Sequence, residues 1–395
     1  MLRVSQLAAS VQPSATLAAG AKARQLKATG VKVYDFSLGE PDFNTPEHIC
    51  KAANDAMKAG HTHYTPVNGI PELKASVCKW YKTYHGLDVK PDQVLISNGA
   101  KHSIHNALSA TLNPGDEVII PTPYWVSYSD LVQMTGAKPV LVHTTAAAGF
   151  KMTAAQLKAA ITPKTRLLMI NSPSNPTGKV YTRSELEAIA DVMLQSDADI
   201  LSDEIYEQLT YGDAKPTCIA TLRPQLAERT ITISGASKSY AMTGWRMGWT
   251  VGPKAIIDAM GTIQSQQTSC PSSVSQYAML AALEGPQECV AEMRKEFEAR
   301  RNLAADLLKK IPGITFPMPE GAFYIFFDVS HYFGKTIGGL KITNDADFCK
   351  GALETAHVNL VQGSAFGAPG FARMSYATSR TEIEGGLAAL AKWLM

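Results

Sequence analysis

Short apolar runs and helical patterns alternate through the middle of the chain, and this alternation constrains the fold more than any other feature. Helical patterns such as 100–112 and 183–195 separate runs rich in Ile, Leu and Val. Strands are expected at 94–97, 117–120, 166–170, 199–201 and 230–233. Pro121 and Pro123 are expected to end the second of these strands. Repeated strand–helix units predict an α/β fold with a mostly parallel central sheet and helices on both faces.

The alternation stops near Gly285 and Pro286, where one long charged amphipathic helix is predicted over about 287–310. Beyond it the sequence predicts strands at 323–329 and 358–361 and a closing helix at 381–394. The change of pattern indicates a second, smaller α+β domain.

Composition and charge argue against several classes of protein. The chain has 395 residues, with 37 Lys+Arg against 35 Asp+Glu and a formal net charge of +2. This balance gives no electrostatic reason to expect a nucleic acid or a membrane surface as partner. No apolar stretch approaches the roughly 18 residues that cross a bilayer. The six cysteines form no CxxC pair and no signal-peptide pattern is present, so we expect reduced thiols and a cytoplasmic protein.

Polar segments follow several predicted strands at their carboxyl ends, where open α/β sheets collect ligands. They are 97–99, 171–176, 203–206 and 234–238. Each alone could be a plain turn, because Asn, Ser, Gly and Pro are the usual turn formers. Together they bring amide, carboxylate, phenol and ammonium groups to one edge, which predicts a site.

These side chains suggest a particular chemistry. Lys238 could form a Schiff base if desolvation lowers its pKa, although an ordinary surface-loop lysine is the alternative. Asp203 could hold a pyridine nitrogen protonated, bind a metal or cap a helix. Tyr206 and Asn175 could hydrogen-bond a phenolate oxygen. Trp125 offers a flat face for stacking, or would belong to the core.

A phosphate site is indicated beside them. Arg246 could clamp a phosphate together with Ser237 and the N-terminus of the helix after Gly99. The segment 176–179 lacks the glycine spacing of a phosphate loop. The histidine pairs at 61/63 and 102/105 lack further ligands at metal-site spacing, so no metal is expected.

Several segments resemble those of class I aminotransferases, fold type I enzymes that use pyridoxal 5′-phosphate. They are 39–43, 64–73, 123–128, 171–178, 202–207, 234–248 and 373–379. They follow the family's order from about residue 13 to the C-terminus. The segments 13–16 and 99–101 more narrowly resemble the bacterial-type aspartate aminotransferases of subgroup Ib, some of which also accept prephenate.

The resemblance implies the fold of pyridoxal-phosphate-dependent transferases of fold type I. A large cofactor domain would comprise 45–290, and a small domain would combine 1–44 with 291–395. A homodimer with shared active sites is also implied, because Tyr64 would reach the phosphate of the neighbouring subunit.

The resemblance also implies the roles of the catalytic residues. Lys238 would form the internal aldimine and then move a proton between Cα and C4′. Asp203 would pair with the pyridinium nitrogen, Tyr206 and Asn175 would hydrogen-bond O3′, and Trp125 would stack on the ring.

The other implied roles concern the phosphate and the substrate. The phosphate would be held by Arg246, Ser237 and the amides of Gly99, Ala100 and Lys101. The substrates, an amino acid and a 2-oxo acid, would be bound by Gly39, Trp125, Asn175, Arg373, Lys101, Ser14 and Thr16. Within that set Arg373 would take the α-carboxylate, and Lys101 would bind the distal one.

The implied reaction transfers the amino group of L-aspartate to 2-oxoglutarate, giving oxaloacetate and L-glutamate. Gln12 stands where several dual-specificity relatives carry a basic residue, and Ala100 replaces a frequent glycine. The alternatives are a prephenate or aromatic aminotransferase, or a β-lyase or cyclopropane-forming synthase on the same scaffold. A non-enzymatic regulator would carry an added DNA-binding module, which the near-neutral charge does not favour.

Overall fold

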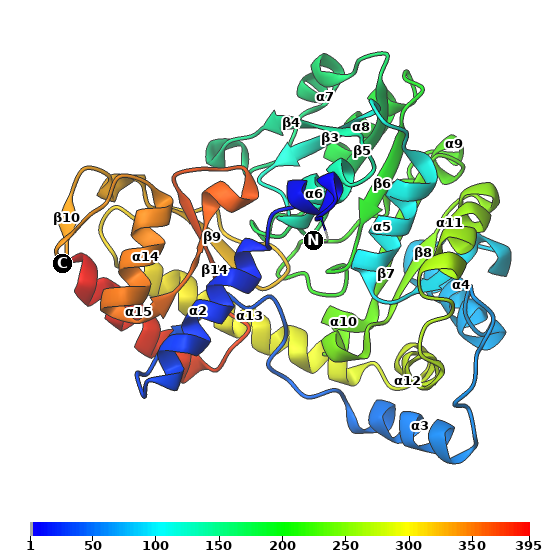
Figure 1. The fold of residues 1–395 in the computed structure, drawn as a ribbon, viewed down its shortest axis with the longest axis horizontal. Helices are drawn as coiled ribbons and strands as arrows, with labels where there is room; N and C mark the ends of the chain where they lie inside the picture. Colours follow the sequence, from blue (N-terminus) through cyan, green and yellow to red (C-terminus); the bar gives the residue numbers. More distant parts are fainter. Residues whose placement is uncertain (1–2) are drawn as a thin grey trace.

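The five apolar runs expected as strands between residues 94 and 233 all enter one seven-stranded sheet in the computed structural model, which describes residues 3–395 (Figure 1). In spatial order its strands are β2 (Val94–Ser97), β8 (Gly248–Val251), β7 (Thr230–Gly235), β6 (Asp199–Asp203), β5 (Thr165–Asn171), β3 (Glu117–Thr122) and β4 (Lys138–His143). β8 runs antiparallel to both neighbours, and the other pairs are parallel. The predicted mostly parallel α/β sheet is therefore confirmed.

Two details of this sheet correct the sequence prediction. β4 and β8 lie outside the predicted strands, and β4 is an edge strand, where Pro139 removes no essential bond. β3 continues through Pro121, which was expected to end it. Pro121 pairs with Val142 of β4, whereas the pairing with β5 stops at Ile119, so its missing N–H costs little on that side.

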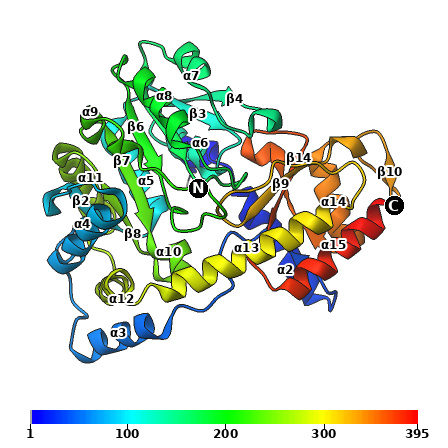
Figure 2. The ribbon, with the colours of Figure 1, turned by 180° about the vertical axis from the view of Figure 1, so that it is seen from behind.

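Helices cover both faces of this sheet (Figure 2). Leu167 and Met169 of β5 share one apolar cluster with α5 (Ala100–Thr111), α6 (Ser127–Gln133) and α11 (Lys254–Gln267). Leu168 and Ile170 point to the other face, where α7 (Ala154–Ala160) and α8 (Arg183–Met193) pack. Alternate side chains of the same strand are thus buried on opposite faces, as in a covered parallel sheet.

A third apolar cluster packs α3 (Glu47–Lys58), α4 (Pro71–His85) and α12 (Ser273–Glu284) against the β2–β8 edge. Shorter helices are α1 (Gln6–Ser10), α9 (Pro224–Ala227) and α10 (Ala236–Ser239). None of the helices within residues 3–395 is both long and apolar enough to span a membrane.

A smaller region follows the long helix α13 (Glu288–Leu308), which runs between the two parts of the molecule (Figures 1 and 2). Its sheet has the order β13 (Val361–Gln362), β14 (Phe371–Ser375) and β9 (Tyr324–Asp328), all antiparallel. The helices α14 (Asp345–Ala356) and α15 (Arg380–Leu394) and the hairpin β10 (Thr336–Ile337)–β11 (Leu340–Lys341) complete it.

The N-terminal part of the chain joins this smaller region. β1 (Tyr34–Asp35) pairs in parallel with β12 (Val358–Asn359), and α2 (Ala15–Ala28) lies beside them. The single strand expected at 358–361 is therefore wrong, because β12 and β13 belong to different sheets. The exact domain limits stay a prediction.

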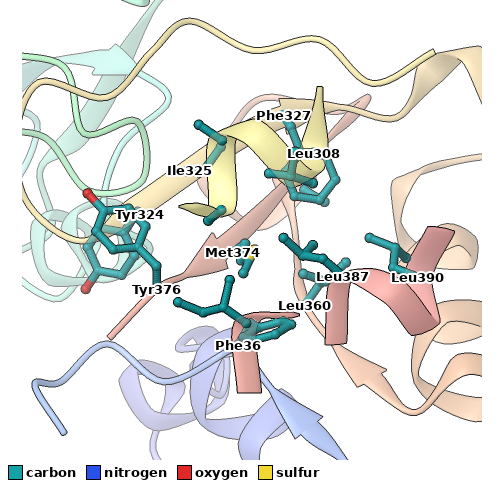
Figure 3. Packing of buried hydrophobic residues seen from close by; sticks show 14 of the residues in the cluster. Phe36, Leu308, Tyr324, Ile325, Phe327, Leu360, Met374, Tyr376, Leu387 and Leu390 are labelled. Atoms are coloured by element: carbon teal, nitrogen blue, oxygen red, sulfur yellow. The ribbon is translucent and has the colours of Figure 1, made fainter. Parts of the chain in front are cut away.

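The core of the smaller region joins its helices, its sheet and the N-terminal segment. Figure 3 shows Phe36 beside Met374 and Leu360, in the same cluster as Leu308 and Leu387, while Tyr324 lies at the end nearest the larger region. Both ends of the chain therefore contribute to this core.

Candidate active site

A cavity of about 340 Å³ lies at the carboxyl ends of β5, β6 and β7, facing the smaller region. The predicted site residues that line it are Ser14, Thr16, Gly39, Ala100, Lys101, Trp125, Asn175, Asp203, Tyr206, Ser237, Lys238, Arg246 and Arg373. Gly99 does not line the cavity itself but lies against Arg246, which does. Tyr64 does not line it: this side chain is 90% exposed, beside Cys270 in a separate surface hollow.

Lys238 is delivered to the cavity by the turn from β7 into α10. A Cβ on Gly235 would lie 2.8 Å from the Met247 carbonyl oxygen, so only glycine allows this close turn. The Lys238 ammonium donates a hydrogen bond to the Gly39 carbonyl. Burial, aided by Arg246, lowers the pKa of Lys238 to about 8. A substantial neutral fraction, which is the nucleophilic form, is therefore present at mildly alkaline pH.

Asp203 ends β6 and is 4% exposed. Its Oδ2 accepts a hydrogen bond from the Tyr128 hydroxyl at 2.5 Å, and its Oδ1 accepts one from the Ile205 amide at 3.3 Å. Burial raises the pKa of Asp203 to about 6. No ion pair in the described chain includes this carboxylate, so its surroundings suit a cationic ligand atom. Sequence reasoning missed Tyr128, although it ends the 123–128 segment.

A pair of phenols also lines the cavity. The hydroxyls of Tyr206 and Tyr324 are 2.8 Å apart, and burial raises the pKa of both phenols. Tyr324 was missed because it comes from β9 in the other sheet. A Cβ on Gly39 would lie 2.8 Å from the Tyr324 hydroxyl, which explains glycine there.

Arg373 lies on β14 and is 1% exposed. Its guanidinium donates to the Asn175 Oδ1 at 3.1 Å and to the Ser37 carbonyl at 2.6 Å, and it lies 4.6 Å from the Tyr324 ring centre. Its Nε has no hydrogen-bond partner, and no carboxylate of residues 3–395 pairs with it. A buried cation with an unused donor favours an anionic ligand.

A second anion site is formed where α5 begins. Gly99 has φ +84°, and a Cβ there would lie 2.4 Å from Nη2 of Arg246. A Cβ on Gly248 would lie 2.5 Å from the Ala100 amide nitrogen. The two glycines therefore let a guanidinium and a helix N-terminus meet, with the buried Ser237 lining the same cavity. Such a cradle suits a phosphate.

The mouth of the cavity carries further cations. Lys101 Nζ lies 4.8 Å from the Trp125 ring centre, and burial together with Arg246 lowers its pKa. Arg24, Leu17 and other side chains that sequence reasoning missed also line this opening. Arg24 and Leu17 come from the part of α2 beyond the 13–16 segment. The Thr16 hydroxyl is buried without a partner.

One group within residues 3–395 has metal-ligand atoms within 4.8 Å of one another: His85, Glu204 and Glu207. The sequence did not indicate it, since His85 ends α4 whereas both glutamates lie in the loop after β6. It does not line the cavity. The six cysteines are all free, and none lines the cavity either.

Comparison with known proteins adds independent findings. Residues 31–390 match the family model described as aminotransferase class I and II. The chain is 50% identical to an aspartate/prephenate aminotransferase of Cereibacter sphaeroides, covering 96% of this chain and 95% of the relative. It is 49% identical to an aspartate aminotransferase of Geobacillus stearothermophilus, covering 97% and 96%. The crystal structure of a Rhizobium meliloti aspartate aminotransferase superimposes with a TM-score of 0.97 at 44% identity, covering 100% and 99%.

Proposed function

Because this chain belongs to the class I and II aminotransferase family, we propose that it transfers the amino group of L-aspartate to 2-oxoglutarate. The products are oxaloacetate and L-glutamate. The observation that carries this proposal is the buried Arg373 without a carboxylate partner, in the same cavity as the buried Lys238. An amino acid would bring the missing carboxylate and place its Cα near an amine that can exchange a proton.

The residues of the cavity fit pyridoxal 5′-phosphate. The cradle at Gly99, Ser237 and Arg246 would hold the phosphate, and the unpaired carboxylate of Asp203 would hold the ring nitrogen protonated. Tyr206 would hydrogen-bond the phenolate oxygen. When bound, the cofactor supplies an electron sink for the electron pair released from the Cα–H bond.

Asn175 contacts the anion site at Arg373. Its Oδ1 accepts from Arg373, and its backbone N–H donates to Asn171 Oδ1 at 2.8 Å. The side-chain NH₂ is thereby aimed away from Arg373 and is free to donate to the cofactor's phenolate oxygen. Trp125 would stack on the ring and support Lys101 above it.

The chain's own groups then perform the proton transfer. Arg373 would orient the substrate through its α-carboxylate, and Lys238 would remove the Cα proton and return it to C4′. Its lowered pKa suits this role, because a base works best when its pKa lies near the working pH. Lys101, with Ser14 and Thr16, would bind the distal carboxylate.

The remaining proposals follow from the same family. We propose a cytoplasmic homodimer in which Tyr64 reaches the neighbouring active site, with domains at 45–290 and at 1–44 plus 291–395. Prephenate is the second candidate amino acceptor, favoured by the relative named aspartate/prephenate aminotransferase. Gln12, at a position where several dual-specificity relatives carry a basic residue, argues against prephenate as the main amino acceptor.

The test is an absorbance titration of the purified protein loaded with pyridoxal phosphate. Aspartate should convert the visible band to the near-ultraviolet band of the aminated cofactor, and 2-oxoglutarate should reverse the change. Lys238→Ala should abolish turnover and still hold the cofactor noncovalently. Lys179→Ala, which removes a lysine paired with Glu320 outside this cavity, should keep turnover.

Two results would contradict the proposal. Normal turnover by Lys238→Ala would remove the lysine from the mechanism. A far higher kcat/KM for alanine or an aromatic amino acid than for aspartate would exclude a dicarboxylate substrate.

A further inference from the structure

A buried acid–base cluster lies behind the strand ends that carry Asp203 and Lys238. His85 is the last residue of α4, and its Nε2 is 2.7 Å from Oε2 of Glu207. The two side chains are 6% and 2% exposed. The Ser234 hydroxyl donates to the other oxygen of Glu207 at 3.0 Å. The cluster therefore joins a helix, the loop after β6 and the end of β7.

Glu204 is the second carboxyl group of this cluster. The Ser202 hydroxyl donates to its Oε1 at 2.9 Å, and burial raises the pKa of Glu204 to about 7. Asp203, the preceding residue, lines the cavity, whereas Glu204 does not. At the end of β6, the side chain of Asp203 therefore points into the active-site cavity, and the next side chain, Glu204, points into the buried cluster.

The charges of the cluster have to be balanced inside the protein. Burial lowers the pKa of His85, but the hydrogen bond and charge of Glu207 outweigh it, so the net shift is upward. The other titratable groups that face the cluster are Tyr81 on α4, Cys218 before α9 and Tyr240 after α10. Burial raises the pKa of all three, so they are neutral near pH 7. His85 supplies the compensating cation.

We propose that His85 is a positioning residue for the active site: its imidazolium neutralises Glu207, and Glu207 holds Ser234 at the end of the strand that leads to Lys238. Ser234 is paired with Trp249 on β8 and immediately precedes Gly235, where the lysine turn begins. The consequence for catalysis rests on the proposed function. The ion pair itself can be tested on cofactor-free protein.

The first experiment measures the thermal midpoint of cofactor-free wild type and His85→Gln between pH 4.5 and 8. Stabilisation by His85 is complete below the usual histidine pKa of about 6.5 and is lost as pH rises through its raised folded value. The deficit of the variant should therefore be largest between pH 4.5 and about 6.5 and should shrink as the pH rises beyond that range.

The double variant His85→Gln/Glu207→Gln shows whether the single variant loses stability because Glu207 lacks a cation or because the side chain at position 85 has changed shape. Two amides can hydrogen-bond without a charge, so the double variant should be more stable than His85→Gln over this pH range. In the loaded enzyme, His85→Gln should lower kcat about tenfold with the KM for aspartate within about twofold, and the double variant should recover most of kcat.

His143→Gln is the matched control. His143 is exposed and its Nδ1 lies 3.3 Å from the Thr122 hydroxyl, so no ion pair is lost and no pH-dependent deficit is expected. The proposal is overturned if the His85→Gln deficit is equal at every pH and the double variant restores nothing. It is also overturned if a chelator lowers the wild-type midpoint but not that of His85→Gln, which would make the cluster a metal site. Absence of aspartate turnover in the wild type would refute the proposed function and leave the stability result standing.

Discussion

Two buried arginines, Arg300 and Arg373, differ in the groups that their guanidinium groups contact. Arg300 on α13 is 7% exposed, and its guanidinium pairs with Asp42 at 2.6 Å and with Glu296 at 2.9 Å. Arg373 on β14 is 1% exposed and has only neutral acceptors, Asn175 and Ser37. A charge buried without a counterion is costly, so the unpaired guanidinium indicates a ligand and the paired one a structural role.

The surroundings of Arg300 support that distinction. Its guanidinium lies 5.0 Å from the Phe43 ring centre and 5.7 Å from that of Phe297. Glu296 also accepts from Arg380 at 2.6 Å. The network ties the interdomain helix α13 to α15 and to the 39–43 loop, whose Gly39 carbonyl accepts from Lys238.

Among the variants that test this difference between the two arginines, Arg373→Leu should show the largest loss of activity. The kcat/KM for aspartate should fall about a thousandfold, because losing one partner of a buried charge pair costs about 4 kcal/mol. The thermal midpoint of the cofactor-free protein should stay near that of the wild type, since removal of an uncompensated charge offsets the lost hydrogen bonds. Steady-state kinetics and thermal unfolding measure the two quantities.

Arg373→Lys is the control that keeps the positive charge but removes the planar, bidentate guanidinium. Its kcat/KM for aspartate should lie between those of Arg373→Leu and wild type. An Arg373→Leu enzyme that kept kcat/KM within tenfold would show that this arginine does not bind the substrate. A large fall in its thermal midpoint would give Arg373 the structural role assigned to Arg300.

Arg300→Leu should show the reverse pattern. It leaves two carboxylates without their guanidinium and should cost about 2 kcal/mol of folding stability, reduced from the buried-pair value because both acids are partly exposed. The kcat/KM for aspartate should change less than about tenfold, through the 39–43 loop alone. Chemical denaturation gives the stability change. Asp42→Asn, which removes one of the two pairs, should cost less, and an unchanged stability in Arg300→Leu would contradict the structural assignment.

A smaller, pH-dependent effect is expected at Glu296. Its hydrogen bond to Arg380, with Arg300 beside it, lowers the pKa of Glu296 to about 2. The stabilisation is therefore present above the unfolded value of about 4.3 and is lost as pH falls toward 2. Glu296→Gln should cost about 1 kcal/mol at pH 7, because a partly exposed pair is screened.

The difference between Glu296→Gln and wild type should narrow when unfolding is measured at pH 4 and below. Glu298→Gln is a suitable control, because Glu298 pairs with Arg301 on the same helix at 3.2 Å and touches neither buried arginine. A deficit for Glu296→Gln that does not change with pH would mean that shape, rather than charge, stabilises this network.

The contrast between the arginines also explains what the sequence could predict. Asn175, Asp203 and Lys238 follow parallel strands, and parallel strands bring their carboxyl ends to one edge, so their meeting follows from the pattern. Arg373 was placed through the family resemblance, because nothing local distinguishes a ligand-binding arginine from a paired one. The helical and strand limits around these residues mostly agree with the predictions, since strong apolar periodicity marks them.

Contacts between distant elements could not be predicted in this way. Tyr324 reaches Tyr206 from another sheet, and His85 reaches Glu207 across 122 positions of sequence. Such pairs depend on how helices and sheets pack, which local patterns do not encode. β8 was missed because it is a short antiparallel insertion that follows the lysine segment directly.

The smallest loss of activity is expected at Lys101, a cation at the surface that, like Arg373, has no carboxylate partner in the described chain. Lys101 lies over Trp125 at the cavity mouth. Lys101→Met should lower kcat/KM for aspartate about fivefold, because a partly solvated ion pair contributes about 1 kcal/mol. The value for alanine, which has no distal charge, should stay nearly unchanged, so the ratio of the two is the measurement.

Arg24→Met gives the control, because Arg24 lines the same mouth from α2 and no distal-carboxylate role is assigned to it. If Lys101→Met slowed aspartate and alanine equally, Lys101 would act on the cofactor rather than on the substrate side chain. If only Arg24→Met changed the ratio, the distal carboxylate would be bound from α2. Whether Lys101 or Arg24 binds the distal carboxylate, that cation would lack a protein partner because the substrate supplies one, as proposed for Arg373. The loss of kcat/KM would be smaller than for Arg373→Leu, because water already screens charges at the cavity mouth.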